Sequence, residues 1–274
     1  MSSTNPQQPV VLITGARTGI GRACADLLVA RDCRVYGTSR HPPDADLGFT
    51  MLTMDVNETA SVEAGVHTLL DREGRIDVVV NNAGFGYGGA VEDTTLEQAK
   101  ATFETNCFGV LRVCQAVLPT MRAQRAGLIV NVSSIGGRLG VPYQGLYCAS
   151  KFAVEGMTET LRMEVKAFGI DVVLLEPGDT RTDFTDNRLP NRSSSPASAY
   201  HVQYRETMKS IEDDERQGAD PALVARTLWR IIQARRPKPR YVAARLLDRA
   251  GVWAKRWLPN SWFEWIVMKK YGLQ

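Results

Sequence analysis

Apolar runs short enough to be strands alternate along the chain with longer segments of helical periodicity. Five runs have the length and composition of buried strands: residues 10–15, 34–39, 76–84, 127–134 and 170–178. Helical length and periodicity mark three segments between them: 19–32, 95–124 and 146–169. Strands that are apolar throughout, and that helices separate, indicate a parallel sheet covered on both faces. The pattern therefore predicts an α/β fold with a doubly wound parallel sheet flanked by helices, in which ligands bind beyond the carboxyl ends of the strands.

The pattern changes after residue 182. Residues 183–217 are polar and include a stretch rich in serine and proline. They predict a long mobile connection, which is either a lid over a site or a plain surface loop. The basic stretch 234–240 predicts a solvated surface turn, with an anion site as the alternative. We expect a single domain over residues 1–274, in which 241–274 form a C-terminal helical substrate-binding extension.

This extension holds four of the five tryptophans in the chain. Their spacing places Trp253 with Trp257, and Trp262 with Trp265, on shared helix faces, with lysines and arginines between them. Three roles suit the pattern: core packing or a subunit contact, a wall of an apolar substrate cleft, and peripheral docking on a membrane, since aromatic and basic residues are mixed. The sequence leaves the choice among them open.

Composition narrows the class of protein. The chain of 274 residues is 44% apolar and 23% charged, as in ordinary globular proteins, and its net charge of +3 gives no indication of nucleic-acid binding. The first residues are polar and then strand-like, without a leader or spanning pattern. Five scattered cysteines and three distant histidines form no metal-ligand motif, so we expect no metal, buried thiols and a cytoplasmic protein.

A glycine-rich motif, TGARTGIG at 14–21, lies between the first strand and the first helix. This is the context in which such a loop binds the diphosphate of a dinucleotide, as in Rossmann-type sheets. Gly15 permits a tight turn, Gly19 lets the backbone approach the diphosphate, and Gly21 lets the helix pack closely. The free N–H groups at the start of the helix, from Thr18 and Ile20, then face the anion.

The end of the second strand indicates which dinucleotide is bound. A site for NAD usually has a carboxylate there, but this chain has Ser39 followed by Arg40. A guanidinium binds a 2′-phosphate in a forked, charge-assisted way, and Arg17 in the glycine loop adds a second cation. We therefore predict NADP(H) as the cofactor. A solvated arginine at a strand end is the alternative for Arg40.

The stretch YCASK places Tyr147 and Lys151 one helical turn apart. Such a pair is often no more than two neighbours on an ordinary helix. Here it stands in order with TGARTGIG, NNAG (81–84), Asn106 in TNCFG, NVSS (131–134) and EPG (176–178). With these motifs the chain resembles the classical short-chain dehydrogenases/reductases over residues 10–182. It is most similar to the branch that acts on steroids, retinoids and other lipophilic carbonyls.

The resemblance implies a catalytic set of Asn106, Ser134, Tyr147 and Lys151. In the family, the asparagine distorts its helix and holds a water in a proton relay to the lysine. Lys151 binds the nicotinamide ribose and, together with the positive charge of the oxidised ring, lowers the pKa of Tyr147. Ser134 holds the substrate oxygen, and Tyr147 exchanges a proton with it while hydride passes between nicotinamide and carbonyl carbon.

The resemblance also assigns further cofactor contacts by position. Asp55 meets the adenine amino group with Val56 beside it, an asparagine-rich turn lines the adenosine ribose, and the segment after the fifth strand meets the carboxamide and diphosphate. The residues in the last two groups are Asn81, Asn82, Ala83 and Gly84, and Pro177, Gly178, Thr180 and Thr182.

Substrate and partners follow from the more variable parts. Residues 136–146 are mostly apolar, which favours a lipophilic ketone, aldehyde or alcohol over a sugar. The helices at 95–124 and 146–169 are expected to form the interface of a homodimer or homotetramer, as the resemblance implies. A non-catalytic NADPH-binding sensor is the alternative function, and an epimerase or dehydratase acting on nucleotide sugars is a third.

Overall fold

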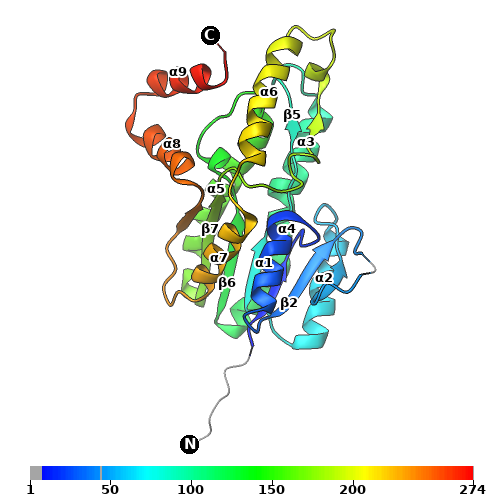
Figure 1. The fold of residues 1–274 in the computed structure, drawn as a ribbon. Coiled ribbons are helices and arrows are strands. Elements are labelled where there is room, and N and C mark those ends of the chain that lie inside the picture. The colour runs from blue at the N-terminus through cyan, green and yellow to red at the C-terminus, as the bar shows by residue number, and fades with distance from the viewer. Residues whose placement is uncertain (1–7, 44, 274) are drawn as a thin grey trace, which may run out of the picture.

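A computed structural model describes residues 8–43 and 45–273, which form a seven-stranded parallel sheet between layers of helices (Figure 1). The strand order is β3–β2–β1–β4–β6–β7–β9, so the winding direction reverses between β1 and β4. A reversal of this kind leaves a crevice at the carboxyl ends of the strands. The strands are β1 Val10–Ile13, β2 Arg34–Ser39, β3 Thr50–Thr53, β4 Val78–Asn81, β6 Gly127–Val132, β7 Ile170–Pro177 and β9 Arg240–Ala243. The predicted Rossmann-type fold class is confirmed.

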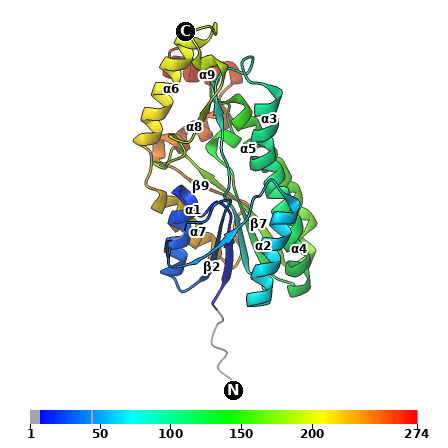
Figure 2. The ribbon, with the colours of Figure 1, turned by 90° about the vertical axis from the view of Figure 1, so that its right-hand side faces the viewer.

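Two hydrophobic cores lie on opposite faces of the sheet, which explains why its strands are apolar throughout. Figure 2 shows the two helical layers edge-on, with α1 and α7 on one face and α2, α4 and α5 on the other. Along β1, Val10 and Leu12 pack into the core under α2, α4 and α5, whereas Val11 and Ile13 pack under α1 and α7. The helices are α1 Gly19–Val29, α2 Thr59–Glu73, α4 Gly109–Gln124, α5 Gly145–Glu164 and α7 Pro221–Ile232.

The segment 95–124 is two α-helices joined by a π-helical turn. Helix α3 (Leu96–Phe103) begins at a capping box, in which Thr95 and Gln98 satisfy each other's backbone N–H groups. The turn at Glu104–Phe108 then contains Asn106, and α4 follows directly. A π-turn inserts a residue into the helical repeat and is typical of functional sites. The local distortion that the family resemblance implied at Asn106 is present.

Residues 183–217 do not form the long connection expected from their polarity. Strand β8 (Leu189–Pro190) pairs with β5 (Tyr87–Gly88), and α6 (His201–Arg216) follows. The segment is fixed to the body by hydrogen bonds of buried polar groups, as when the Ser193 hydroxyl donates to Asp93 and accepts from the Ala90 N–H. Serine and asparagine promote turns, and in this segment they also bind distant backbone groups, which composition alone does not reveal.

The C-terminal extension is helical, as expected. Helices α8 (Leu246–Trp257) and α9 (Asn260–Lys270) form an arm that stands beside the body of the protein (Figure 1). Among the described residues, no helix combines the length and the apolar character needed to cross a membrane. The five cysteines are free, buried thiols.

Candidate active site

A cleft of about 1250 Å³ opens at the carboxyl ends of the strands. It runs from the glycine loop after β1, past the ends of β4, β6 and β7, to α6 and the C-terminal arm. The structure brings most of the residues that the sequence singled out to its wall. These are Gly15, Arg17, Thr18, Gly19, Ile20, Ser39, Arg40, Asp55, Val56, Asn82, Ala83, Gly84, Ser134, Tyr147, Lys151, Pro177, Gly178, Thr180 and Thr182.

The glycine loop has the geometry that a diphosphate requires. Gly15 and Gly19 have φ angles of +67° and +58°, which glycine adopts without the strain that a side chain would bring. Gly19 and Ile20 open α1 and line the cleft, so the positive end of the helix faces the cavity. These residues therefore fit the diphosphate of a dinucleotide, whose nicotinamide would supply hydride chemistry when bound.

Gly21 lies behind the glycine loop, where the absence of a side chain leaves room for the Gly15 carbonyl and the Asn82 amide. A Cβ atom there would lie 2.3 Å from the Gly15 carbonyl oxygen and 2.5 Å from Asn82 Nδ2. The same Asn82 amide donates to the Gly15 carbonyl at 3.1 Å and to the Thr14 carbonyl at 3.0 Å. Gly21 is thus required for close packing of α1 on the glycine loop, as predicted. It affects the cofactor only through the position of this loop.

Gly21→Ala is expected to weaken binding of a nicotinamide dinucleotide at least tenfold and to lower the free energy of unfolding by about 1–3 kcal/mol, the usual effect of overpacking. The added methyl group must displace the Gly15 carbonyl or the Asn82 amide. Fluorescence titration with NADPH and chemical denaturation measure the two effects. Gly156→Ala is the matched control, because a Cβ atom at this position on α5 meets nothing within 4 Å. Equal cofactor affinity in both variants would contradict this role.

Helix α5 positions the tyrosine and the lysine. Tyr147 and Lys151 lie one turn apart, and the Lys151 ammonium is 5.8 Å from the centre of the Tyr147 ring. Lys151 is buried, and its Nζ donates to the Val132 carbonyl at 2.9 Å. The Ser134 side chain hydrogen-bonds to Tyr147 from the loop after β6. Tyr147 lies 4 residues before Lys151 and 13 residues after Ser134, and the three side chains meet in the wall of the cleft.

The pKa of Tyr147 differs in direction from the expectation. Burial raises it well above the ordinary value of a phenol, and the hydrogen bond from Ser134 only partly opposes this. Burial also lowers the pKa of Lys151, to about 8, while the Glu155 carboxylate acts in the opposite direction. The protein by itself therefore keeps Tyr147 as a neutral proton donor. With the cofactor bound, the charges of Lys151 and of an oxidised nicotinamide should together lower the pKa of Tyr147, and this remains a prediction.

Asn106 lies behind the cleft wall, fully buried in the π-turn. Its Oδ1 accepts from the Phe85 N–H at 3.0 Å, and its Nδ2 donates to the Phe85 carbonyl at 2.8 Å and to Ser150 Oγ at 3.0 Å. These bonds tie the turn after β4 to α5. The structure thus gives Asn106 a positioning role, and the water relay that the resemblance implied stays a prediction.

Asn81 is placed differently from its expected role as a lining residue. Its side chain is buried between the sheet and α4, and its Nδ2 donates to Asn131 Oδ1 at 2.8 Å. Side chains alternate along a strand, so an asparagine at the end of β4 faces the helix layer while its successor faces the cleft. Asn82, Ala83 and Gly84 provide the lining instead.

An ionic cluster forms one helical turn beyond Lys151, with Glu155 and Glu176 buried and Glu159 exposed. Arg240, the first residue of β9, binds the carboxylates of Glu155, Glu159 and Glu176, and Glu176 also pairs with Arg138. The solvated turn expected over 234–240 is therefore wrong at its last residue. The local sequence is basic and proline-rich, and only the addition of β9 to the sheet edge brings Arg240 to these partners.

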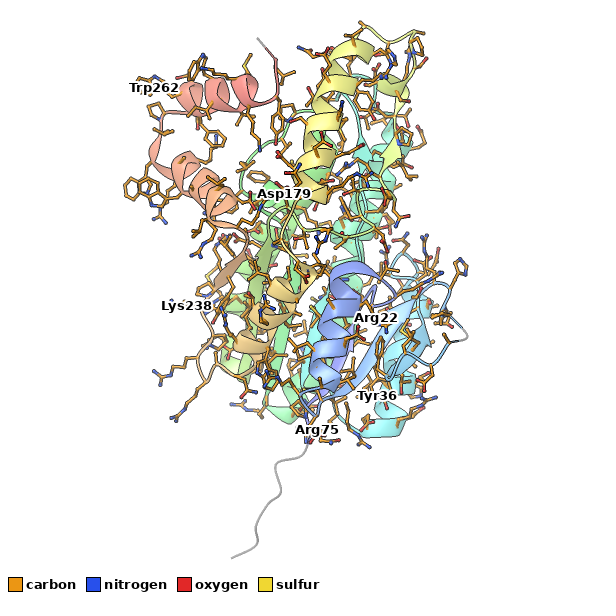
Figure 3. The ribbon with its side chains drawn as sticks, viewed as in Figure 1. Arg22, Tyr36, Arg75, Asp179, Lys238 and Trp262 are labelled. Atoms are coloured by element: carbon orange, nitrogen blue, oxygen red, sulfur yellow. The ribbon has the colours of Figure 1, made fainter. Side chains whose placement is uncertain are left out.

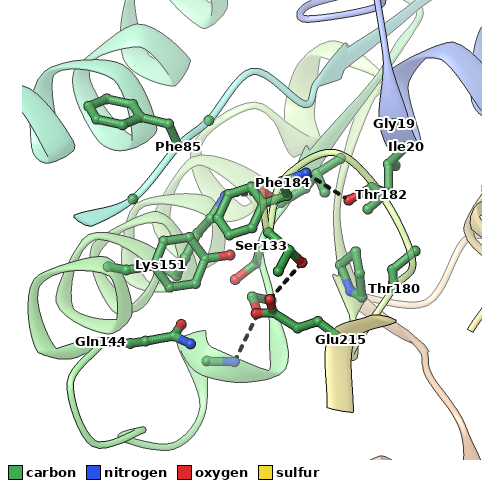
Figure 4. A pocket seen from close by; sticks show the side chains of 18 of the residues that line it. Gly19, Ile20, Phe85, Ser133, Gln144, Lys151, Thr180, Thr182, Phe184 and Glu215 are labelled. Carbon is green, nitrogen blue, oxygen red and sulfur yellow. Dashed lines mark hydrogen bonds between the residues drawn. The ribbon is translucent and has the colours of Figure 1, made fainter. Parts of the chain in front are cut away.

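The far end of the cleft contains side chains that the sequence analysis missed. Figure 4 shows Lys151 of α5, Phe184 of the segment after β7 and Glu215 of α6 around the same cavity. The rings of Phe184 and Tyr147 lie 5.5 Å apart. Glu215 pairs with Arg188 and accepts from the Thr185 hydroxyl at 2.7 Å. The apolar spacing of Tyr204, Met208 and Ile211, which α6 buries, was the available signal for this helix.

Residues 9–193 match the family model described as short chain dehydrogenase. The chain belongs to this family of oxidoreductases, as its motifs predicted. A 3-ketodihydrosphingosine reductase of Bacteroides thetaiotaomicron is 40% identical to it over 98% of this chain and 100% of the relative.

Solved structures agree with the family assignment. A short-chain dehydrogenase from Streptomyces avermitilis is similar with a TM-score of 0.73 and 33% identity, over 86% of this chain and 87% of that one. A short-chain dehydrogenase/reductase from Burkholderia phymatum, in complex with NAD, has a TM-score of 0.77 and 25% identity, over 89% and 92%.

Proposed function

We propose that this protein is an NADP(H)-dependent reductase of lipophilic ketones with long alkyl chains. The observation that carries the proposal is one continuous cleft, with the glycine loop and Arg40 at one end and Ser134, Tyr147 and Lys151 near its middle. Ser134 holds the substrate oxygen beside the phenol, Tyr147 donates its proton to that oxygen, and Lys151 binds the nicotinamide ribose. Nicotinamide supplies the hydride when bound.

The wall beyond Tyr147 supports an apolar substrate. Loops, α6 and the arm contribute apolar side chains to it: Leu139, Val141, Phe184, Leu189, Ile211, Leu247, Phe263, Ile266 and Val267. Asp179 lies among them, and burial, reinforced by the neighbouring Asp248, raises its pKa to about 6. Arg245 already pairs with this carboxyl at 3.7 Å, and a cationic group on the substrate would be a further partner that favours its ionised form. Long-chain amino ketones such as 3-ketodihydrosphingosine, on which the Bacteroides relative is named to act, combine both features.

The positively charged side chains at the end of β2 support NADP(H), rather than NAD, as the cofactor. Ser39, Arg40 and His41 line the cleft, and Arg17 approaches from the glycine loop, with its Nη1 3.4 Å from the His41 carbonyl. Arg17 and Arg40 therefore both border the part of the cleft at the end of β2. Forked hydrogen bonds to a 2′-phosphate suit this pair, whereas the ribose hydroxyls of NAD would find serine in place of a carboxylate.

The test is a screen of ketones and aldehydes of increasing chain length, followed at the NADPH absorbance band with NADPH and NADH in parallel. We expect kcat/KM to rise with chain length and to be at least tenfold higher with NADPH. In Arg40→Asp the carboxylate repels the 2′-phosphate, so this preference should fall by about a hundredfold, since one charge-assisted contact is lost and one repulsion added.

Arg226→Asp is the matched control, because it makes the same charge change at an exposed site on α7. An unchanged cofactor ratio in Arg40→Asp would rule out the assigned phosphate site. Cofactor binding without turnover of any carbonyl would favour the sensor function instead.

Location and assembly complete the proposal. Five free, buried thiols suit a reducing compartment such as the cytoplasm.

Large apolar side chains are exposed on the π-turn and on α4 and α5, including Phe108, Leu111, Phe152 and Met163. Their burial against a second copy supports a homodimer or homotetramer formed through these helices.

A further inference from the structure

Helix α8 turns its apolar face toward solvent. Leu246, Trp253 and Trp257 repeat at helical spacing and are 82%, 67% and 65% exposed. The opposite side of the helix, with Val252 buried and Asp248 paired to Arg245, faces the protein. A surface helix of a globular protein normally has the reverse arrangement, with its apolar side inward. Intramolecular packing therefore does not explain the apolar residues of α8.

Helix α9 extends the same feature. Trp262 and Trp265 are 66% and 54% exposed, while Phe263 is buried against the protein. Figure 3 shows Trp262 at the outer side of the arm, away from the sheet. Together, Leu246, Trp253, Trp257, Trp262 and Trp265 are called the tryptophan surface. Four indoles exposed on one arm are far more than the scattered apolar residues that a soluble surface tolerates.

Positive charge surrounds the tryptophan surface. Residues 245–274 contain six basic and two acidic side chains, a net charge of +4, whereas the remaining 27 basic and 28 acidic residues leave the rest of the chain near neutrality. The Arg256 guanidinium lies 5.7 Å from the Trp257 ring centre, and the Lys269 ammonium lies 5.1 Å from that of Trp265. Each helix of the arm thus carries a basic group beside one of its exposed indoles.

We propose that the arm is a peripheral membrane-docking element that seats the tryptophan surface on an anionic lipid bilayer. Indole rings prefer the headgroup level, where the ring is apolar and its N–H finds a partner. Lysine and arginine side chains extend from such a helix to lipid phosphates. An amphipathic helix with this composition lies in the plane of the interface.

The positive charge of the arm favours a membrane, rather than a second copy of the chain, as the partner of the tryptophan surface. Two of the six basic side chains, Arg245 and Lys270, pair with Asp179 and Asp214 outside the arm. A two-fold contact through the tryptophan surface would still bring two arms with an excess of basic side chains against each other. An anionic bilayer neutralises the same charge. Leu247, Phe263 and Ile266 of the same two helices line the cleft, so docking places the cleft wall next to the lipid.

The experiment uses the full chain and flotation with vesicles of phosphatidylcholine, with and without phosphatidylglycerol. We expect binding to the anionic vesicles that weakens as salt is raised, because exposed charges are screened. Trp253→Ala/Trp257→Ala and Trp262→Ala/Trp265→Ala should each lower vesicle affinity at least tenfold. Val202→Ala, which removes a comparably exposed apolar side chain on α6 (70% exposed), should leave it unchanged. Acyl-brominated lipid should quench the fluorescence of the wild-type protein.

Three results would overturn the proposal. They are no binding to anionic vesicles at low salt, equal binding by the wild-type protein and both tryptophan variants, and a dimer in sedimentation that these substitutions dissociate. Reduction of a short, water-soluble ketone should be unaffected in the variants, since the exchanged indoles point away from the cleft. That activity therefore reports on the proposed function separately from docking.

Discussion

Tyr147→Phe is expected to lower kcat for carbonyl reduction by about 10²–10⁴-fold, the usual contribution of a positioned general acid. The substitution removes only the hydroxyl that bonds to Ser134. The ring still packs 5.5 Å from Phe184, so the cleft keeps its shape. NADPH affinity should remain nearly the same, because the glycine loop and Lys151 are untouched. Single-turnover kinetics and fluorescence titration of the cofactor measure the two quantities.

Tyr36→Phe provides the control for this experiment. The Tyr36 hydroxyl on β2 donates to Glu73 at the end of α2 at 2.6 Å, and neither residue lines the cleft, so its removal should leave turnover unchanged. Retained turnover in Tyr147→Phe would show that another group protonates the substrate. Simultaneous loss of turnover and of cofactor binding would instead show that the phenol supports the cofactor site.

Lys151→Met should have the second-largest effect, because it removes the cation and keeps the volume of the side chain. We expect kcat/KM to fall by about a hundredfold or more and the cofactor to bind more weakly, since the ribose loses a charge-assisted donor. Lys100→Met, at an exposed site on α3, is the matched control. A variant with normal kcat/KM would exclude Lys151 from the reaction.

The pH dependence distinguishes electrostatic action of Lys151 from a purely structural role. With a pKa of about 8, Lys151 is charged below pH 8 and neutral above it. Activity that requires the ammonium is therefore present at low pH and lost as pH rises through about 8. Glu155 raises this pKa, so Glu155→Gln should move the loss to lower pH. A profile that is flat around pH 8 in the wild-type protein would contradict the requirement for charge.

Some residues of the site could be predicted from local sequence motifs, and others could not, because their partners are distant in the chain. TGARTGIG and YCASK are local motifs, and the chemistry of their residues follows from the strand or helix that carries them. The role of Arg240 is not local, because its partners on α5 and β7 are distant in sequence. The same holds for Glu215, which lines the cleft only because α6 folds back over it. Long-range ion pairs leave no periodic signal in a single chain.

The sequence by itself determined the parallel α/β sheet and the family, and it predicted candidate site residues, because apolar runs, the glycine motif and YCASK act within one element or at one junction. Only the tertiary structure decided that part of the polar segment 183–217 forms α6 (His201–Arg216) against the cleft, that Asn81 faces the helical layer, and that burial raises the pKa of Tyr147. Each of these depends on the side chains and the solvent exclusion that distant segments contribute. A sequence pattern reports the preferences of neighbouring residues, whereas burial is a property of the whole fold.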